Sequence, residues 1–255
     1  MAAGKSWSRE CLLLALNLYH KLPFGQFHQN NAEIVEIARR MGRTPGSMAM
    51  KLCNLASLDP AERARGIAGL GNASKLDRRM WKEFHENWSE LAPESERLIE
   101  ELMREPSAGT EEEIESYPGE LTEALHLAKV RRKQSFFRGL VLASYDRRCC
   151  ITGLAVPELL NASHIVPWNL DESNRLNPRN GLCLNALHDR AFDRGLISVS
   201  PDLMVLISGR LKDSAPSHAK DLLLSSEGRT IGQPQRFAPA PDFLQWHATN
   251  VFAGA

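Results

Sequence analysis

The sequence lacks any apolar run long enough to cross a membrane. The longest, such as Cys11–Leu16, are far shorter than the roughly 20 residues that a bilayer requires. The N-terminal residues also lack a basic stretch followed by an apolar one, which a secretory signal would have. The 5 cysteines are an odd number and form no paired CxxC motifs, which argues against a disulfide framework and against zinc sites of that type. We therefore expect a cytoplasmic protein with reduced thiols and no membrane partner.

The sequence also lacks net charge, because its 255 residues include 31 basic and 31 acidic side chains. The charges are unevenly distributed. Residues 1–91 carry 13 basic and 9 acidic groups, residues 92–123 carry 2 and 11, and residues 124–150 carry 7 and 1. Because charges act over a Debye length of about 10 Å, the local excess matters more than the total. Two basic segments separated by an acidic one remain compatible with a nucleic-acid partner.

Residues 1–91 are predicted to form a helical domain. Four segments place apolar side chains at the i, i+3, i+4 spacing and begin near a residue that can cap a helix. They run from Trp7 to Tyr19, from Asn30 (with Glu33 completing a capping box) to Gly42, from Thr44-Pro45 through Leu55, and from Ser74 through Leu91.

The second and third of these segments resemble a helix-turn-helix, with the turn at Gly42. A helix-turn-helix inserts its second helix into the major groove of DNA. The resemblance implies that the exposed face of that helix contacts DNA. The alternative is a helical hairpin that only packs and carries surface charge for solubility. The candidate DNA-binding residues on this face are Arg43, Thr44, Ser47 and Lys51.

Three domains follow from the change in composition along the chain. Residues 1–91 are the helical domain, and residues 92–120, acidic and containing Pro and Gly, are predicted to be a linker with at most one short helix. Residues 121–255 begin with a long helix over about 121–145. Short strands are predicted after it at Ile151–Thr152, Ala162–Val166, Leu182–Leu184 and Leu203–Ser208, with a short helix at Leu187–Arg194. Arg131 and Arg138 share one face of the long helix and are further candidate DNA contacts. We expect an α+β protein.

The residues that indicate a chemistry lie in the second half. His164 stands in an extended segment, Asn180 follows 16 residues later, and His188 lies 8 residues after that, on a predicted short helix. Hydrolysis of a phosphodiester needs a base near neutral pH and a cation that offsets the developing charge. Two histidines brought together by a β-hairpin can supply the base and a ligand for the cation. The alternative is that both are ordinary core or surface histidines.

With the flanking residues, Ala162-Ser-His-Ile-Val-Pro-Trp168 and Asn180-Gly-Leu, this spacing resembles the HNH nuclease motif. The resemblance implies a ββα-metal fold in the C-terminal domain, with surrounding helices and strands. It further implies that His164 is the general base, that His188 is a metal ligand, and that Asn180 holds the loop and orients the base.

The sequence departs from many HNH enzymes at the metal site. Ser163 stands where an acidic or histidine ligand often precedes the base, and Phe192 stands where a second helix histidine is common. Asp193 is therefore a candidate ligand beside His188 and Ser163, with Asp189 as an alternative. We expect a divalent ion, Mg²⁺ first, with Mn²⁺ or Ni²⁺ as alternatives.

Over about residues 125–255, the sequence resembles an HNH subfamily of restriction endonucleases. The resemblance is carried by Arg131-x-x-Gln134-x-x-Phe137-Arg138, by Cys150-Ile-Thr-Gly153 and by Phe243-Leu-Gln-Trp-His247, which resembles the C-terminal helix of that subfamily. We therefore expect a metal-dependent endonuclease that cuts double-stranded DNA in restriction or defence, acting as a homodimer at least on DNA. Dependence on modified bases stays open. The alternatives are a DNA-binding regulator with an inactive HNH domain, and an RNA-directed or homing nuclease, for which the sequence has no distinguishing feature.

Overall fold

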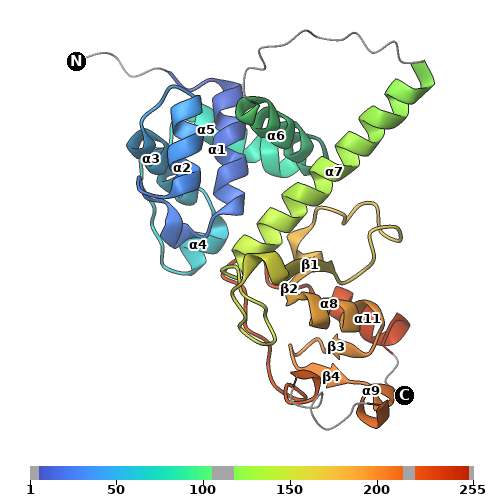
Figure 1. The fold of residues 1–255 in the computed structure, drawn as a ribbon. Coiled ribbons are helices and arrows are strands. Elements are labelled where there is room, and N and C mark those ends of the chain that lie inside the picture. The colour runs from blue at the N-terminus through green and yellow to red at the C-terminus, as the bar shows by residue number, and fades with distance from the viewer. Residues whose placement is uncertain (1–5, 105–117, 215–221, 253–255) are drawn as a thin grey trace. The chain divides into compact units, whose positions relative to one another are not determined.

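The computed structural model describes residues 6–104, 118–214 and 222–252, and it confirms the α+β class (Figure 1). The chain divides into two compact units, Met1–Phe136 and Phe137–Ala255. The first is helical. Its elements are α1 (Arg9–Lys21), η1 (Phe24–Gln26), α2 (Ala32–Arg40), α3 (Pro45–Ala56), α4 (Pro60–Ala64), α5 (Lys75–Glu86), α6 (Trp88–Met103) and most of α7 (Pro118–Ser144).

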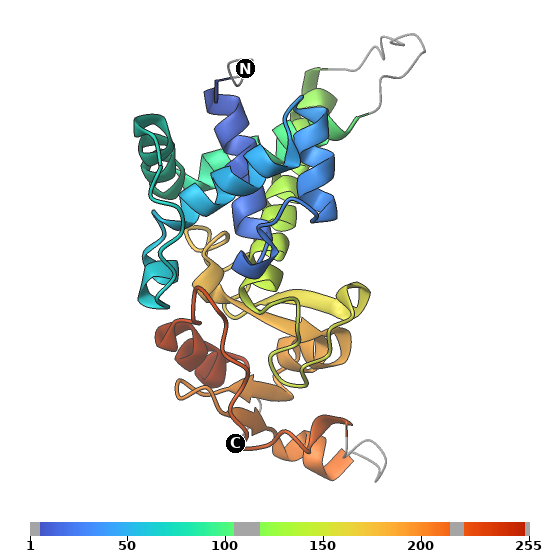
Figure 2. The same ribbon diagram turned by 90° about the vertical axis from the view of Figure 1, so that its left-hand side faces the viewer.

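The core of the first unit is built around α1, which contacts α3, α5 and α6 (Figures 1 and 2). Its residues from Leu12 to Leu16 are almost completely buried on all sides, which explains why this segment is the longest apolar run. Ser8 caps its start by accepting a hydrogen bond from the Cys11 N–H. The helix predicted for residues 7–19 is therefore present, shifted by two residues.

The predicted second and third helices are also present. Asn31, not Asn30, caps α2, because its carboxamide oxygen accepts the N–H groups of Glu33 and Ile34. Thr44 caps α3 as expected. Gly42 has φ 64° and turns the chain between them, a conformation that costs glycine little. The predicted fourth helix is two: α5 starts at the Ser74 capping box, and Asn87 separates it from α6.

Lys51 is not on an exposed face, contrary to the sequence prediction. Its side chain is 8% exposed and its Nζ lies 2.8 Å from both carboxylate oxygens of Asp77, which is completely buried. Asp77 also accepts the Ser74 N–H in the capping box of α5. The Lys51 Nζ lies 4.8 Å from the centre of the Trp7 ring. This ion pair therefore joins α3 to the start of α5 inside the first unit.

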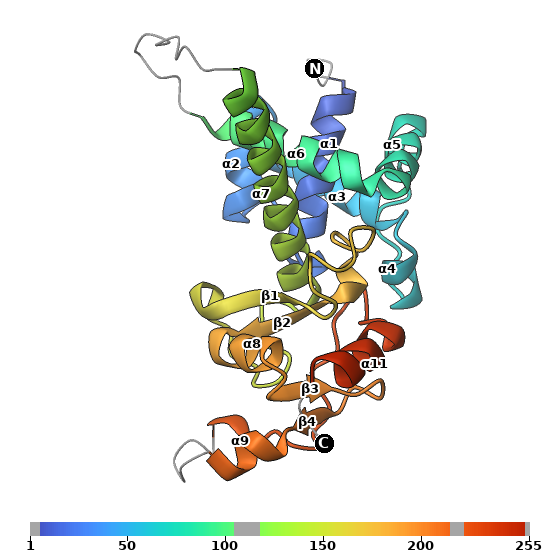
Figure 3. The same cartoon turned by 90° about the vertical axis from the view of Figure 1, so that its right-hand side faces the viewer.

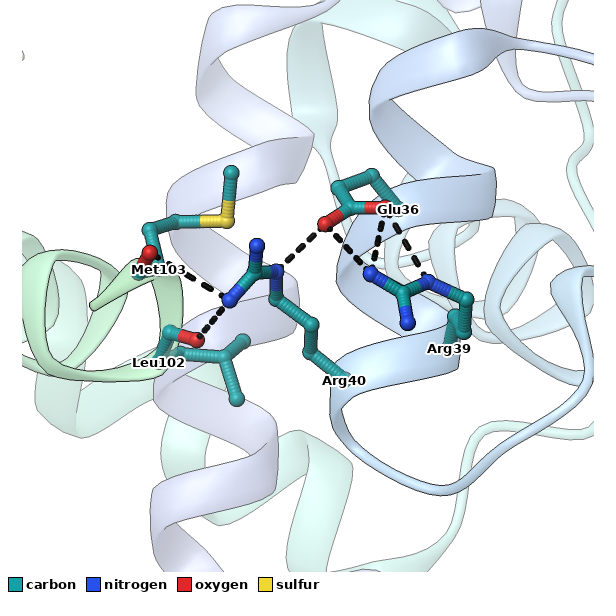
Figure 4. A network of polar contacts seen from close by, with 5 residues as sticks. All are labelled: Glu36, Arg39, Arg40, Leu102 and Met103. Atoms are coloured by element: carbon teal, nitrogen blue, oxygen red, sulfur yellow. Dashed lines mark hydrogen bonds and ion pairs between the residues drawn. The ribbon is translucent and has the colours of Figure 1, made fainter. Parts of the chain in front are cut away.

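The acidic segment is not a linker over its first half. Residues 92–103, assigned to the predicted linker 92–120, belong to α6, and Leu91, Ala92 and Ser95 are buried. Figure 4 shows one attachment: Arg40 of α2 donates from Nη1 to the carbonyls of Leu102 (3.2 Å) and Met103 (3.3 Å). The acidic composition did not indicate a linker here, because Glu100 and Glu101 lie exposed on an amphipathic helix and Glu96 is buried in it. Residues 105–117 lie outside the described residues.

Arg40 also donates from Nε to Glu36, and Glu36 accepts from Arg39 as well (Figure 4). These hydrogen bonds, first from Arg39 and then from Arg40, lower the pKa of the Glu36 carboxyl to about 2. Glu36 therefore stays ionised and holds the Arg40 guanidinium toward the C-terminal carbonyls of α6.

Helix α7 passes through the boundary between the units. Phe136 packs in the first unit against Trp88 and Phe84, while Phe137, Leu140 and Val141 are buried in the second unit. The long helix predicted over about 121–145 is therefore present. The boundary predicted at residue 121 differs from the observed division, because two adjacent aromatic side chains of one helix enter different cores.

The second unit contains two antiparallel hairpins (Figures 1 and 3). β1 (Leu160–His164) pairs with β2 (Gly181–Asn185) so that His164 stands opposite Gly181. α8 (Ala186–Asp193) follows directly and packs on both strands. The remaining elements are η2 (Pro157–Leu159), η3 (Pro178–Asn180), β3 (Ile197–Val199), β4 (Val205–Ile207), α9 (Gly209–Ser214) and α11 (Pro241–Asn250).

The sequence predictions for this unit were accurate for β1, β2, α8, β4 and the C-terminal helix, within a few residues. β3 was not predicted, and the strand predicted at Ile151–Thr152 is a turn. Cys149, Cys150 and Cys183 are buried as core residues. Across the described ranges of the chain, no helix combines the length and the apolar character that crossing a membrane would require.

The buried ion pair of Lys51 allows a stability test. Lys51→Ala should lower the free energy of unfolding by about 3–5 kcal/mol, because the Asp77 carboxylate would stay buried without its cation. Lys82→Ala is the matched control: Lys82 pairs with Glu86 at 3.7 Å on the exposed surface, and its loss should cost less than about 1 kcal/mol. Urea unfolding of both variants measures the difference. Equal effects would contradict the buried pair.

Candidate active site

His164 ends β1, and its two ring nitrogens are in different environments. Nε2 lies 3.0 Å from the main-chain carbonyl oxygen of Arg175. Since a carbonyl only accepts, Nε2 carries the proton and Nδ1 keeps the lone pair. Burial of the ring lowers the pKa of His164 below its ordinary value of 6.5, against a smaller opposing effect of the hydrogen bond to Arg175. The imidazole is therefore neutral at pH 7 and can accept a proton at Nδ1.

The His164 ring is held by aromatic contacts. Phe137 of α7 stacks on it with ring centroids 3.8 Å apart and an interplanar angle of 13°, and Trp168 contacts it edge-on at 5.4 Å. The stacking depends on Gly181, which faces His164 across the hairpin. A Cβ at position 181 would lie 2.9 Å from Phe137 and 2.5 Å from Val141. Glycine therefore makes room for the ring that orients the imidazole.

Asn180 fastens the chain immediately after His164. Its side chain is buried, with Oδ1 accepting the Val166 N–H at 2.8 Å and Nδ2 donating to the Val166 carbonyl at 3.0 Å. The main-chain carbonyl of Asn180 also accepts the Ile165 N–H. These three hydrogen bonds extend the β1–β2 pairing past the end of the strands and fix the exit of the chain from His164.

The loop between the two strands is stabilised by Arg175. Its Nε donates to the Trp168 carbonyl at 2.9 Å and its guanidinium lies 5.3 Å from the centre of the Trp168 ring. The Arg175 carbonyl is the acceptor for His164. One residue thus positions both the Trp168 ring and the proton-carrying nitrogen of His164. Sequence reasoning did not identify Arg175, because its role depends on a main-chain carbonyl.

His188, in the first turn of α8, has the opposite tautomer. The side chain of Asn185 caps α8 by accepting the His188 N–H through Oδ1, and the same oxygen lies 3.0 Å from His188 Nδ1. Nδ1 therefore carries the proton, and Nε2 keeps the lone pair. Nε2 is buried without a hydrogen-bond partner among the residues that the structure describes. Burial lowers the pKa of His188, so the ring is neutral and Nε2 can serve as a ligand.

Next to His188, Asp189 is held against β1. Its carboxylate accepts a hydrogen bond from the hydroxyl of Ser163 and another, at 2.7 Å, from the carboxamide of Asn161. Ser163 is buried and precedes His164 directly. The predicted ligand Asp193 lies one turn further along α8 at an exposed position, and partial burial followed by the charge of Asp189 raises the pKa of its carboxyl.

The described residues offer a divalent ion one suitable nitrogen ligand but not a complete set of protein ligands. The buried lone pair of His188 Nε2 has no other use in the described fold. No group of three or more His, Cys, Asp or Glu side chains in the described ranges lies close enough to hold a metal. Few protein ligands and several waters suit Mg²⁺, which keeps much of its hydration shell.

The other candidate DNA contacts fall on both units. In the first, Arg43 is half-buried, with its guanidinium 4.0 Å from the centre of the Trp7 ring and Nη2 donating to the Ser6 carbonyl. Thr44 is exposed, and its hydroxyl caps α3 by accepting the Ser47 N–H. Arg131 is exposed in the first unit. Arg138 is exposed in the second and donates to the Pro157 carbonyl at 3.3 Å.

A strand hairpin followed by a helix, with one histidine on the first strand and one on the helix, is the arrangement that ββα-metal nucleases have. Residues 149–200 match the family model described as HNH endonuclease. The match covers β1, β2, α8 and β3, and thus both histidines and Asn180. It supports the predicted HNH resemblance and indicates a nuclease that acts on DNA, a phosphodiester hydrolase. HNH endonucleases generally use a divalent metal ion. A search of curated proteins found no match.

Behind α8, His247 of α11 connects three elements of the second unit. Its ring stacks on Phe192 at 3.7 Å, Nδ1 accepts from the Ser198 hydroxyl at 2.8 Å, and Nε2 donates to the Phe192 carbonyl at 3.2 Å. Burial lowers the pKa of His247 to about 4, against a smaller opposing effect of that carbonyl. The neutral ring therefore supports the helix that carries His188.

This depressed pKa predicts how stability depends on pH. The unfolded chain, with a histidine pKa of about 6.5, binds a proton that the folded chain excludes until about pH 4. Stability should therefore fall as pH drops from 6.5 to 4, by about 3 kcal/mol from His247 alone. Urea unfolding between pH 7.5 and 4.5 measures this. His247→Gln should show a shallower pH dependence, and identical slopes for both proteins would exclude His247 as the cause.

Proposed function

We propose that this protein is a metal-dependent HNH endonuclease that hydrolyses phosphodiester bonds of duplex DNA. The proposal rests mainly on two neutral histidines with opposite tautomers. One lies on the strand and one on the helix of the segment that matches the HNH model. One leaves Nδ1 free and the other leaves Nε2 free. A proton acceptor and a metal ligand are the two groups that this hydrolysis needs.

His164 acts as the general base in this proposal. Its Nδ1 takes a proton from the attacking water, while Nε2 keeps its own proton and donates it in a hydrogen bond to the Arg175 carbonyl, which stabilises the imidazolium that forms. Phe137 and Trp168 keep the ring in place. Asn180 is a positioning residue, because its side chain contacts Val166 and not the reacting atoms.

His188 would hold the divalent ion through Nε2, and Asn185 fixes the tautomer that leaves this nitrogen available. Asp193 and Ser163 are the other ligands that the sequence predicts, with Asp189 as the alternative to Asp193. When bound, the ion would neutralise charge on the scissile phosphate and on the leaving oxygen. Mg²⁺ is the expected ion, with Mn²⁺ or Ni²⁺ as alternatives.

DNA would be bound through both units. Arg131 and Arg138 are exposed cations on α7, and Arg43, Thr44 and Ser47 lie at the start of α3, the second helix of the helix-turn-helix resemblance. Lys51 is not a DNA contact in this proposal, since it is buried against Asp77. A recognition unit joined to a nuclease suits a restriction or defence enzyme. The homodimer on DNA stays a prediction, which sedimentation with and without duplex DNA tests.

His164→Ala should lower the nicking of supercoiled plasmid by about 10²- to 10⁴-fold, the usual contribution of a general base. Because burial lowers the pKa of His164 below 6.5, this base is already deprotonated at pH 7. The wild-type rate should therefore change little with pH near 7 and fall at lower pH, where His164 becomes protonated. The assay compares Mg²⁺, Mn²⁺, Ni²⁺ and EDTA, with His28→Ala, at an exposed position of the first unit, as the control.

Undiminished nicking by His164→Ala would remove this residue from the mechanism. If wild-type protein binds duplex DNA but cuts it with none of the three metals, the chain is better described as a DNA-binding regulator with an inactive HNH domain.

Duplex binding by full-length His164→Ala should weaken as salt rises, because phosphate contacts release counterions. Adding Arg138→Ala should reduce the slope of log affinity against log salt by about one, the value expected for one lost phosphate contact. Adding Lys82→Ala instead should leave the slope unchanged, since Lys82 pairs with Glu86. Fluorescence anisotropy measures all three proteins. Equal slopes for the Arg138 and Lys82 variants would exclude Arg138 from the interface.

A further inference from the structure

We propose that Asp189 supplies the carboxylate of the metal site, with Ser163 and Asn161 as the residues that position it. This inference rests on the proposed function and specifies its metal site. The position before His164, where many HNH enzymes place a ligand, holds the hydroxyl of Ser163. In this structure that hydroxyl donates to the Asp189 carboxylate. The carboxylate missing from β1 is thus delivered to the same place from α8.

Two contacts with β1 orient Asp189. Asn161 donates to Oδ2 at 2.7 Å, while Ser163 donates to Oδ1. Asn161 and Ser163 are two residues apart on one strand, so their side chains lie on the same face of it. Each carboxylate oxygen has further lone pairs. Both donors therefore fix the orientation of the group and leave it able to bind a cation.

Asp189 also has an unbalanced charge. No basic side chain lies within ion-pair distance of its carboxylate in the described part of the chain, and its two partners, Ser163 and Asn161, are neutral. Beside it in sequence, His188 keeps a buried lone pair at Nε2. A divalent cation would balance the charge of the Asp189 carboxylate, and the adjacent His188 offers a neutral nitrogen ligand.

Asp193 fits this role less well. It lies about 7.5 Å further along the axis of α8 than His188, at the exposed end of the helix. The hydrogen bonds that reach α8 from β1 end at Asp189 and not at Asp193.

The two aspartates provide a matched pair of variants in one helix. Asp189→Asn and Asp193→Asn each remove one negative charge with almost no change in shape. Binding of Mn²⁺ to the full-length protein without DNA is measured from the electron paramagnetic resonance signal of free Mn²⁺. We expect Asp189→Asn to weaken the affinity by at least about tenfold and Asp193→Asn by less than about threefold. Thermal unfolding in EDTA shows whether each variant is folded.

Ser163→Ala serves as a second variant, since it keeps the carboxylate and removes one of its two donors. It should weaken Mn²⁺ binding by an intermediate amount, and it decides the question if Asp189→Asn does not fold: unchanged affinity would then overturn the inference. Wild-type affinity in folded Asp189→Asn, or an equal or larger loss in Asp193→Asn, would overturn it while the proposed nuclease function stands. Failure of the wild-type protein to bind Mn²⁺ at millimolar concentration would overturn both the inference and the metal dependence.

Discussion

The candidate site depends on the pairing between the Asn180 carboxamide and the main chain of Val166. Both polar groups of Val166 are buried next to the end of β1, and an amide side chain is able to donate to one and accept from the other. A buried peptide group without such a partner would cost about 1–3 kcal/mol. Satisfying it keeps the loop from pulling β1 away from β2. The register that places His164 opposite Gly181 follows from this anchoring.

Burial and hydrogen bonding together distinguish the two histidines. Both rings are neutral because desolvation lowers their pKa values, yet each presents a different nitrogen. The acceptor oxygen decides which nitrogen carries the proton: the Arg175 carbonyl accepts a hydrogen bond from Nε2–H of His164, and the Asn185 carboxamide oxygen accepts one from Nδ1–H of His188. A proton acceptor and a metal ligand can therefore be made from the same side chain. The carboxylate of Asp189, oriented by neutral donors from β1, adds the charge that neither imidazole provides.

The first unit shows how a polar face can be used for folding instead of for a partner. The start of α3 has the composition of a DNA-contacting helix, but Lys51 pairs with Asp77, and Arg43 and Lys51 both lie near the Trp7 ring. The positive charge of this region is thus partly neutralised inside the unit. The proposed DNA contact of this unit therefore rests on exposed Thr44 and half-buried Ser47, and less on charge than the sequence suggests.

Local sequence determined most of the helices and the elements on which the candidate site residues lie. Helix caps such as Ser8, Thr44 and Ser74 act within three residues. Short-range patterns likewise specify the strand of His164, the turn of Asn180 and the helix of His188. Where local pattern and packing disagreed, packing prevailed: acidic residues 92–103 form a helix because one face of it is buried against α1.

The tertiary structure alone decided which atoms of the site are available. Four features depend on residues brought together from distant parts of the chain: the hydrogen bonds of Asp189 to β1, the buried state of Lys51, the ring of Phe137 on His164 and the carbonyl of Arg175. Sequence spacing carries no information about such contacts, because they are set by strand register and by the space that Gly181 leaves. The types of functional group were therefore readable from the sequence, whereas their protonation and partners required the fold.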